Sequence, residues 1–229
     1  MRTVTSMRSI IVSGVRYWRF AAVIVVLAGL LASANAYQHR LVKRTPARSQ
    51  LAAQILEGAK AQLGTRYDSS YRILGYPGGD MPARTGACTD VVIRSLRGIG
   101  LDLQVLVHED MSANRAAYPR ARTDQGLDTS IDHRRVPNLA RYFSRHATTL
   151  TDSVSPATLS EWQPGDIVCW KTIFGRDHIG MVSDGVDASG LPCIIHNEYG
   201  CVEESCLTRW RIVGHYRIPD NMPGLTPRN

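Results

Sequence analysis

Cys88 is placed where a thiol can act as a nucleophile. It follows a glycine-rich stretch, YPGGDMPARTGA, and opens the segment CTDVVIRSLRG, whose apolar residues recur at helical spacing. The pattern predicts that Cys88 lies in or just before the first turn of a helix that Gly98 closes. The free N–H groups and positive dipole at that end of a helix stabilise a thiolate, the nucleophilic form of cysteine. The alternative is a small buried apolar residue.

Two histidines are placed where they can serve such a nucleophile. His178 begins the predicted strand 178–183, and His196 lies in the next predicted strand, 193–197. A hairpin between these strands brings the two imidazoles together. For each histidine the alternative is a hydrogen-bonded structural role. The other candidates for a general base are His108, His133, His146 and His215.

The elements that must position these residues change in kind along the chain. Residues 49–63 trace one apolar helical face, with Ser49 as its N-cap. Residues 101–107 are apolar enough for a strand, with an extension of the connection as the alternative, and a helix is expected from residue 108 to a point before Pro119. Residues 120–135 are charged and rich in turn formers, which predicts a long surface loop. Pro137 then begins a short helix that runs through Arg145.

Short β-rich runs separated by turn residues follow in the last third of the chain, which predicts an antiparallel sheet. These runs are residues 167–170, 178–183, 193–197 and 212–218. Helices followed by such a sheet indicate an α+β domain.

The first 36 residues have the pattern of a secretory signal peptide. Arginines precede an uninterrupted apolar run from residue 20 to residue 32, and Ala34-Asn35-Ala36 fits an A-x-A cleavage site. The apolar run is shorter than the roughly 20 residues that a transmembrane helix needs. We therefore expect cleavage near Ala36. The remainder divides into a basic polar linker (37–50), a catalytic domain (51–219) and a flexible tail (220–229).

The basic charge of the chain is concentrated near its start. The formal net charge is +7, and signal cleavage removes four arginines without any acidic residue. Four more cations lie in the linker, namely Arg40, Lys43, Arg44 and Arg48. The folded domain therefore lacks the basic footprint of a nucleic-acid binder. Membrane contact is expected only through the signal peptide or the linker, and a solvated, disordered linker is the alternative.

All five cysteines follow the signal peptide, and their number is odd. In an exported chain this leaves one thiol free, which we assign to Cys88. Disulfides are then expected among Cys169, Cys193, Cys201 and Cys206, in a pairing that the sequence leaves open. The rival is a zinc knuckle, because Cys193-x2-His196-x4-Cys201-x4-Cys206 has ligand-like spacing. Disulfides are favoured in an exported protein, so no metal and no cofactor are expected.

The order of a helix-start cysteine, a Pro-Gly-Asp turn, a strand led by histidine and a histidine in the next strand resembles the NlpC-type papain-like cell-wall peptidases and related amidases. The strings YPGGDMPARTGACTDVVIRSLR, HEDM, IDHRRVPNL, QPGDIVCW, HIGMVSD and HNEYG also resemble a YijF-like bacterial family of unknown function near that superfamily. The resemblance implies a papain-like (NlpC-type) α+β fold, with the nucleophile helix packed on the C-terminal antiparallel sheet.

The same resemblance implies roles for individual residues. Cys88 is the nucleophile, His178 the general base and acid, and His196 the residue that orients it. Asn197 is the alternative orienting residue, because neighbours on a strand face opposite sides. The flanks depart from the NlpC pattern of Asp before and Ser-Gly after the nucleophile, since Ala87 precedes and Thr89-Asp90 follows. The resemblance therefore implies the type of reaction but not the specificity for a peptide.

The expected activity is that of an exported cysteine hydrolase acting on an amide or peptide bond in peptidoglycan or another envelope polymer. Cys88 attacks the carbonyl and its own N–H stabilises the oxyanion. Expected substrate-binding residues are Asp80, Arg84, Asp90, His133 and Arg134, with structural ion pairs or turns as the alternative. The protein is expected to be a periplasmic or secreted monomer. The alternatives are a non-catalytic envelope-binding or assembly module on the same fold and an acyltransferase.

Overall fold

The computed structural model describes residues 43–119, 126–222 and 225. The predicted signal peptide, the first part of the linker and part of the predicted tail lie outside these residues. The described residues belong to one compact unit, Lys43–Asn229. Among them, no helix is long and apolar enough to cross a membrane.

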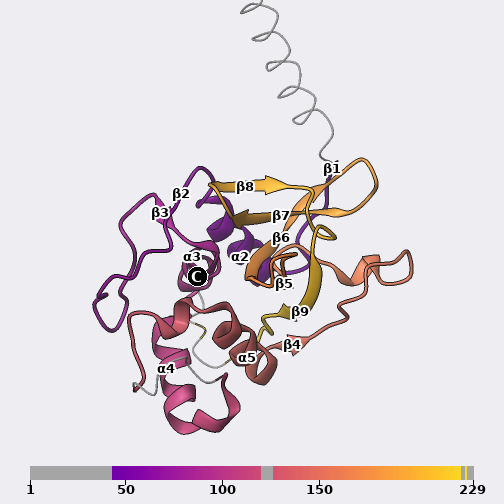
Figure 1. Cartoon of the computed structure of the whole chain (residues 1–229). Coiled ribbons are helices and arrows are strands. Elements are labelled where there is room, and N and C mark those ends of the chain that lie inside the picture. Colours follow the sequence, from indigo (N-terminus) through magenta and orange to yellow (C-terminus); the bar gives the residue numbers. More distant parts are fainter. Residues whose placement is uncertain (1–42, 120–125, 223–224, 226–229) are drawn as a thin grey trace, which may run out of the picture. The chain divides into compact units, whose positions relative to one another are not determined.

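Four α-helices belong to the described chain (Figure 1). They are α2 (Gln50–Lys60), α3 (Cys88–Arg97), α4 (Leu103–Ala113) and α5 (Val136–His146). Short 3₁₀ turns occur at Arg115–Ala117, Asp132–Arg134 and Leu159–Glu161. Helix α2 begins as the sequence predicts, because the Ser49 side chain accepts a hydrogen bond from the backbone N–H of Ala52 at 3.1 Å.

An antiparallel sheet follows the helices and has the strand order β4-β9-β5-β6-β7-β8, with β1 added against β6. Its strands are β1 (Lys43–Arg44), β4 (Thr148–Thr149), β5 (Ile167–Lys171), β6 (Asp177–Val186), β7 (Pro192–Asn197), β8 (Cys201–Glu204) and β9 (Arg211–Arg217). A separate small parallel pair joins β2 (Arg66–Tyr67) to β3 (Thr85–Gly86). The predicted α+β class, with helices first and an antiparallel sheet after them, is confirmed.

The two faces of the sheet bury different cores. Ile167 and Cys169 of β5 pack with residues of α2, α3 and α5 in the larger core. Val168 and Trp170, the alternate residues of the same strand, pack on the other face with Trp162. The helices therefore cover one face of the sheet. On that face, α3 and its first residue, Cys88, pack against β6.

Residues 101–107, predicted as a strand, instead begin α4. The side chain of Asp102 accepts a hydrogen bond from the backbone N–H of Gln104 at 3.1 Å and caps the helix. Leu103, Val107 and Met111 are buried at a spacing of four residues, which fits a helical face. The strand prediction is wrong here because a short apolar run has no clear period of its own.

The predicted surface loop 120–135 is also partly wrong. Residues 120–125 lie outside the described residues, whereas Asp132, His133 and Arg134 form a buried 3₁₀ turn. The amide of Asn138 donates a hydrogen bond to the Asp132 carbonyl at 3.0 Å and ties this turn to α5. Charged residues can be buried here because one of them, Arg134, forms an ion pair with Asp90.

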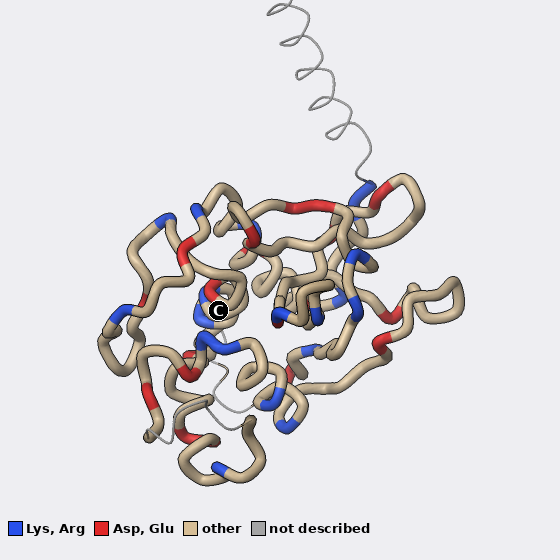
Figure 2. Tube along the Cα trace, in the orientation of Figure 1, with Lys and Arg blue, Asp and Glu red and all other residues tan. Residues whose placement is uncertain are grey.

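The last part of the basic linker belongs to the sheet. Lys43 and Arg44 form β1, which pairs with Val186 and Gly185 of β6. The Arg44 guanidinium contacts Asp184 and also donates to Glu203 at 2.6 Å. These two linker residues are therefore docked on the domain. Basic and acidic residues are otherwise interspersed along the described chain (Figure 2).

Candidate active site

The thiol of Cys88 lies at the N-terminus of α3, as predicted. The side chain of Asp90 accepts the N–H of Ala87 at 2.6 Å and so caps the helix from its third position. Burial raises the pKa of the Cys88 thiol to about 11, although the backbone N–H groups of Ile179, Thr89 and Cys88 itself favour the thiolate. Desolvation therefore outweighs the helix end, and the resting sulfur carries its proton.

The start of β6 lies beside this sulfur. The N–H of Ile179, the residue after His178, points at the Cys88 thiol. Within the described chain no hydrogen bond joins the thiol to the His178 imidazole. Catalytic hydrogen bonds are often long in unliganded enzymes and tighten when substrate binds. The backbone of His178 thus lies next to Cys88, whereas its ring packs with Trp170 and Trp210 on the face of the sheet opposite α3.

His196 is the residue that holds the His178 ring. Nε2 of His178 and Nδ1 of His196 are 2.8 Å apart, and both side chains are buried. Asn197 faces the other side of β7, where its amide donates to the Gly86 carbonyl at 2.9 Å. Strand alternation therefore gives the orienting contact to His196, and Asn197 ties β7 to β3.

A glycine lets the two histidines approach. Gly180 lies on β6 two residues after His178 and faces the same side of the sheet. A Cβ added there would lie 2.8 Å from Ile194 Cγ2 and 3.0 Å from His196 Cβ. Any larger residue would push β7 and His196 away, so the HIG sequence of this strand has a steric reason.

Glu204 completes the chain of hydrogen bonds and was not predicted from the sequence. Its Oε1 lies 2.8 Å from Nε2 of His196 and 2.6 Å from Nη1 of Arg209. β8 pairs His196 with Val202, so Glu204, two residues further on, lies on the same face of the sheet. The sequence signal for β8, and so for Glu204, was a turn of only a few residues after Asn197. That signal was not enough, because β8 is too short to stand out as a strand.

The hydrogen-bond chain fixes the positions of its protons. Hydrogen bonding to Arg209 lowers the pKa of Glu204, so this carboxylate is ionised and can only accept. His196 must then carry its proton on Nε2 and accept at Nδ1. His178 donates from Nε2 and keeps the lone pair of its Nδ1 free. The arrangement therefore leaves Nδ1 of His178 able to accept a proton.

Two tryptophans cover the histidine pair. The ring of Trp210 lies 5.2 Å from that of His178 and 6.3 Å from that of His196, both edge to face. Trp170 lies 5.8 Å from His178 and 6.0 Å from Trp210, so the three rings form one cluster. Burial lowers the pKa of His178 to about 3, and the neighbouring His196 and Arg209 act in the same direction. The resting imidazole is therefore neutral.

A cleft of about 790 Å³ opens at Cys88. Aromatic and charged side chains line it, including Tyr67, Tyr118, Arg135 and Asp177. Its volume lies in the range of small-ligand sites. Cys88 is thus accessible from this cleft, whereas His178 and His196 do not line it.

Of the five predicted substrate-binding residues, only Arg134 lines this cleft. It forms a buried two-pronged ion pair with Asp90, with N–O distances of 3.0 and 2.9 Å. Asp80 pairs with Arg94 at 2.9 Å instead. His133 is buried and does not line the cleft, and burial lowers its pKa to about 4. Asp80 and Asp90 therefore form structural ion pairs, which was the alternative to substrate binding that the sequence offered for these residues.

Arg84 has a backbone role in the described structure. Its φ of 64° lies in the left-handed region, which a non-glycine residue enters only in special turns. Its carbonyl accepts the N–H of Arg66 at 2.9 Å, next to the β2–β3 pair. Arg84 therefore shapes the loop before α3 and does not line the cleft.

All five cysteines are free and buried, so the disulfides expected among the last four are not formed. Cys169 on β5 and Cys201 on β8 are separated by two strands, or roughly 14 Å at about 4.8 Å per strand spacing. A disulfide needs Cα atoms within about 7 Å. Cys206 packs on the opposite face of the sheet from both of them, with Trp170.

The fold and the site define an α+β domain with a cysteine at the start of a helix, beside a buried histidine pair and a cleft. The chain belongs to the family described as a domain of unknown function, DUF1287, whose model matches residues 56–218. The uncharacterized protein YijF of Escherichia coli (strain K12) is 51% identical over 166 residues, covering 71% of this chain and 80% of that protein. The predicted membership of a YijF-like family is confirmed.

Solved structures are more distantly similar. An N-acetylmuramoyl-L-alanine amidase from Bacteroides uniformis ATCC 8492 is 14% identical, covers 75% of this chain and 100% of its own, and has a TM-score of 0.47. NlpC1 from Trichomonas vaginalis is 15% identical, covers 76% of this chain and 46% of its own, and has a TM-score of 0.38.

Proposed function

We propose that this chain is an exported cysteine hydrolase that cleaves an amide or peptide bond in peptidoglycan or another envelope polymer. The observation that carries the proposal is the hydrogen-bonded series His178, His196 and Glu204. Its first residue, His178, precedes Ile179, whose N–H points at the Cys88 thiol, and Cys88 lines a cleft. A nucleophile, a base and a group that orients the base are the parts that covalent catalysis by cysteine requires.

Both reacting groups are neutral at rest, so the proton moves when substrate arrives. Burial keeps the pKa of Cys88 high and that of His178 low. A stable thiolate–imidazolium pair is therefore disfavoured in the free protein. Nδ1 of His178 accepts the thiol proton as the sulfur attacks the carbonyl carbon, which makes His178 a general base.

The remaining steps use the same groups. The N–H of Cys88 is in the first turn of α3, where intrahelical partners are lacking, and it donates to the oxyanion. His178 returns the proton to the leaving amine, which breaks the C–N bond and leaves a thioester on Cys88. His178 then takes a proton from water, the hydroxide attacks the thioester, and the carboxylate product leaves with the thiol restored.

The choice of an envelope substrate rests on the export signal in the sequence and on the cleft. A periplasmic or secreted enzyme meets wall polymers, and the cleft offers aromatic surfaces (Tyr67, Tyr118) together with a cation and an acid (Arg135, Asp177) for a polar chain. In this proposal the protein acts as a monomer and has no nucleic-acid partner.

Digestion of purified peptidoglycan tests this function. The mature protein and its Cys88→Ala variant are incubated with the polymer, and the released fragments are identified by mass spectrometry. Pairs of products, one with a new amine and the other with a new carboxylate, should appear with the unmodified protein only. Equal release by both proteins, or release by neither, would contradict a hydrolase acting on this polymer.

A further inference from the structure

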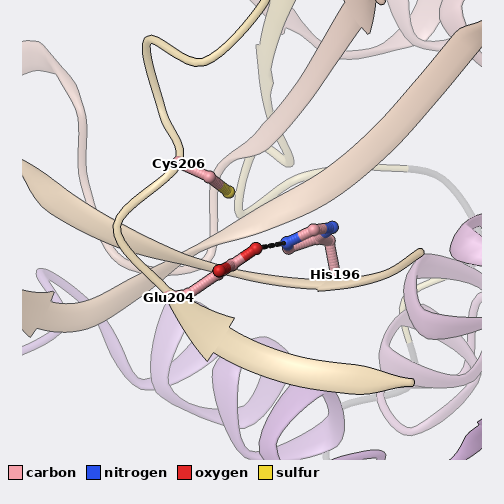
Figure 3. A group of neighbouring side chains, drawn as sticks. All are labelled: His196, Glu204 and Cys206. Carbon is pink, nitrogen blue, oxygen red and sulfur yellow. Dashed lines mark hydrogen bonds and ion pairs between the residues drawn. The ribbon is translucent and has the colours of Figure 1, made fainter. Parts of the chain in front are cut away.

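A cluster of potential metal ligands lies at the outer end of the histidine series. The donor atoms of His196, Glu204 and Cys206 all lie within 4.8 Å of one another. Figure 3 shows the three side chains converging, with the carboxylate of Glu204 hydrogen-bonded to the imidazole of His196. Only His196 and Cys206 of the zinc-knuckle spacing take part, and Glu204 supplies a ligand that the sequence pattern did not include.

The chemistry of the three donors fits zinc or a similar divalent transition metal. Imidazole nitrogen, carboxylate oxygen and thiolate sulfur are the ligand types of zinc sites. Bond lengths of about 2.0–2.3 Å place the donor atoms of a tetrahedral site roughly 3.3–3.8 Å apart. Movements of about 1 Å or less would therefore close the present cluster around an ion. The side chain of Glu204 is 36% exposed, which gives the ion a route from solvent.

The charges near the cluster also allow a cation to bind. Arg209 pairs with Glu204 at 2.6 Å, but it also lies 3.9 Å from Glu198. An ion that takes Glu204 therefore leaves Arg209 a second carboxylate. Nδ1 of His196, bonded to His178, fixes the ring so that Nε2 faces the cluster, which is how outer partners orient metal-binding histidines.

We propose that a zinc-class divalent ion binds to Nε2 of His196, the carboxylate of Glu204 and Sγ of Cys206, and that it switches off the Cys88 centre. The binding half stands on the cluster alone, and the switching half rests on the proposed hydrolase function.

The switch follows from the two tautomers of the histidine pair. Without the ion, Nε2 of His196 donates to Glu204, and Nδ1 of His178 holds a free lone pair. An ion on Nε2 of His196 forces the proton of that ring to Nδ1, from which it donates to His178. Nε2 of His178 must then be the acceptor, so the proton of His178 sits on Nδ1. The nitrogen that should accept the thiol proton is thereby blocked.

Cobalt titration of the full mature chain tests binding without any assay of activity. Co²⁺ bound by a thiolate gives a charge-transfer absorption in the near ultraviolet. We expect this band to saturate at one ion per chain in the unmodified protein and in Cys88→Ala. It should be lost in Cys206→Ser and, as a check against misfolding, in Cys206→Ala with an unchanged circular dichroism spectrum. A band that persists without Cys206, or no band at all, would overturn the site.

Zinc inhibition tests the switch separately. Each protein is compared with its own metal-free rate of peptidoglycan cleavage. At saturating Zn²⁺ the unmodified protein should lose at least tenfold in rate and recover with a chelator, whereas Cys206→Ser should keep its rate. Equal loss in both proteins would place the ion at Cys88 and overturn the switch. A chain that binds Co²⁺ but cleaves nothing without metal would contradict the hydrolase function and leave the metal site standing.

Discussion

The Cys88 thiol is protonated at neutral pH because its burial costs the thiolate more than the surrounding N–H groups return. The thiol pKa is raised to about 11, and a thiol becomes nucleophilic only as the pH rises toward its pKa. We therefore predict that iodoacetamide alkylates Cys88 in the resting protein slowly at pH 7, with a rate that rises about tenfold per pH unit up to roughly pH 11. Peptide mass mapping assigns the label, and Cys88→Ala is the control. A rate that is already constant below pH 8 would contradict this view.

His178 and Asp177 are adjacent residues at the start of β6, and they are the two candidates for the general base. Asp177 lines the cleft with Cys88 but pairs with Lys171 at 2.6 Å, whereas His178 heads the hydrogen-bond series. We predict that His178→Ala lowers the cleavage rate by about 10²- to 10⁴-fold, the usual contribution of a general base. Asp177→Asn, the matched control, should lower it by less than about tenfold. The reverse order would show that the base is misassigned.

In the proposed mechanism, Glu204 acts on the reaction through the two histidines. Removing its charge leaves the His196 tautomer unfixed, so we predict that Glu204→Gln lowers kcat by about 10- to 100-fold with little change in KM. Glu203→Gln is the control, because the adjacent Glu203 faces the other side of β8 and binds Ser183 and Arg44, each at 2.6 Å. Steady-state kinetics of both variants decide the point. Equal losses would mean that the effect is a general disturbance of β8.

Sequence reasoning found the residues whose positions follow from local pattern. His178 and His196 were found because a two-residue period and a hairpin predict their proximity. Glu204 was missed because its role depends on the register of β8, a strand of four residues. The raised pKa of Cys88 was missed as well. Burial depends on the packing of α3 against the whole sheet, which helix spacing does not show.

The position of α3 depends on the ion pair between Asp90 and Arg134. Their side chains are 3% and 2% exposed, so loss of the cation would leave a buried, uncompensated carboxylate. Such a loss usually destabilises a protein by about 3–5 kcal/mol. We predict that Arg134→Met lowers the free energy of unfolding by about that amount, measured by urea denaturation.

The exposed pair Lys171–Asp177 provides the control for that measurement, because its side chains are 39% and 28% exposed. Lys171→Met should cost less than about 1 kcal/mol. If Arg134→Met also cost less than about 1 kcal/mol, the ion pair would not be what holds α3 and the 3₁₀ turn together.

The elements themselves could be predicted where their period was clear. The helix that Ser49 caps and the strands around His178 and His196 show a helical or a two-residue period and were found. The second half of α4 was expected as a helix from residue 108, but its start at Leu103 was missed. The short apolar run there shows no clear period, and a capping Asp102 carries too little weight in a single sequence. The buried turn Asp132–Arg134 was missed because charged residues predict exposure unless their partner is known.

At the scale of the whole molecule, the layers explain why the site forms where it does. Helix α3 packs on the same face of the sheet as the larger core, and the start of β6 meets its first residue. The histidine series lies on the opposite face, with Trp170 and Trp210, and runs along β7 and β8 toward the edge of the sheet. The α+β order was visible in the sequence because helical and strand periods occupy different thirds of the chain. Strands β1 and β8 could not be predicted from the sequence, since their formation depends on the strands with which they pair.

In the proposed reaction, Cys88 forms a covalent acyl-enzyme with an envelope substrate. The most direct measurement is the intact mass of the protein after acid quenching during turnover on soluble peptidoglycan fragments. We predict a mass increase equal to the acyl part of the substrate, located on Cys88 by peptide mapping and absent from Cys88→Ala. Cleavage without any adduct on Cys88, proceeding at an equal rate in Cys88→Ala, would contradict the claim.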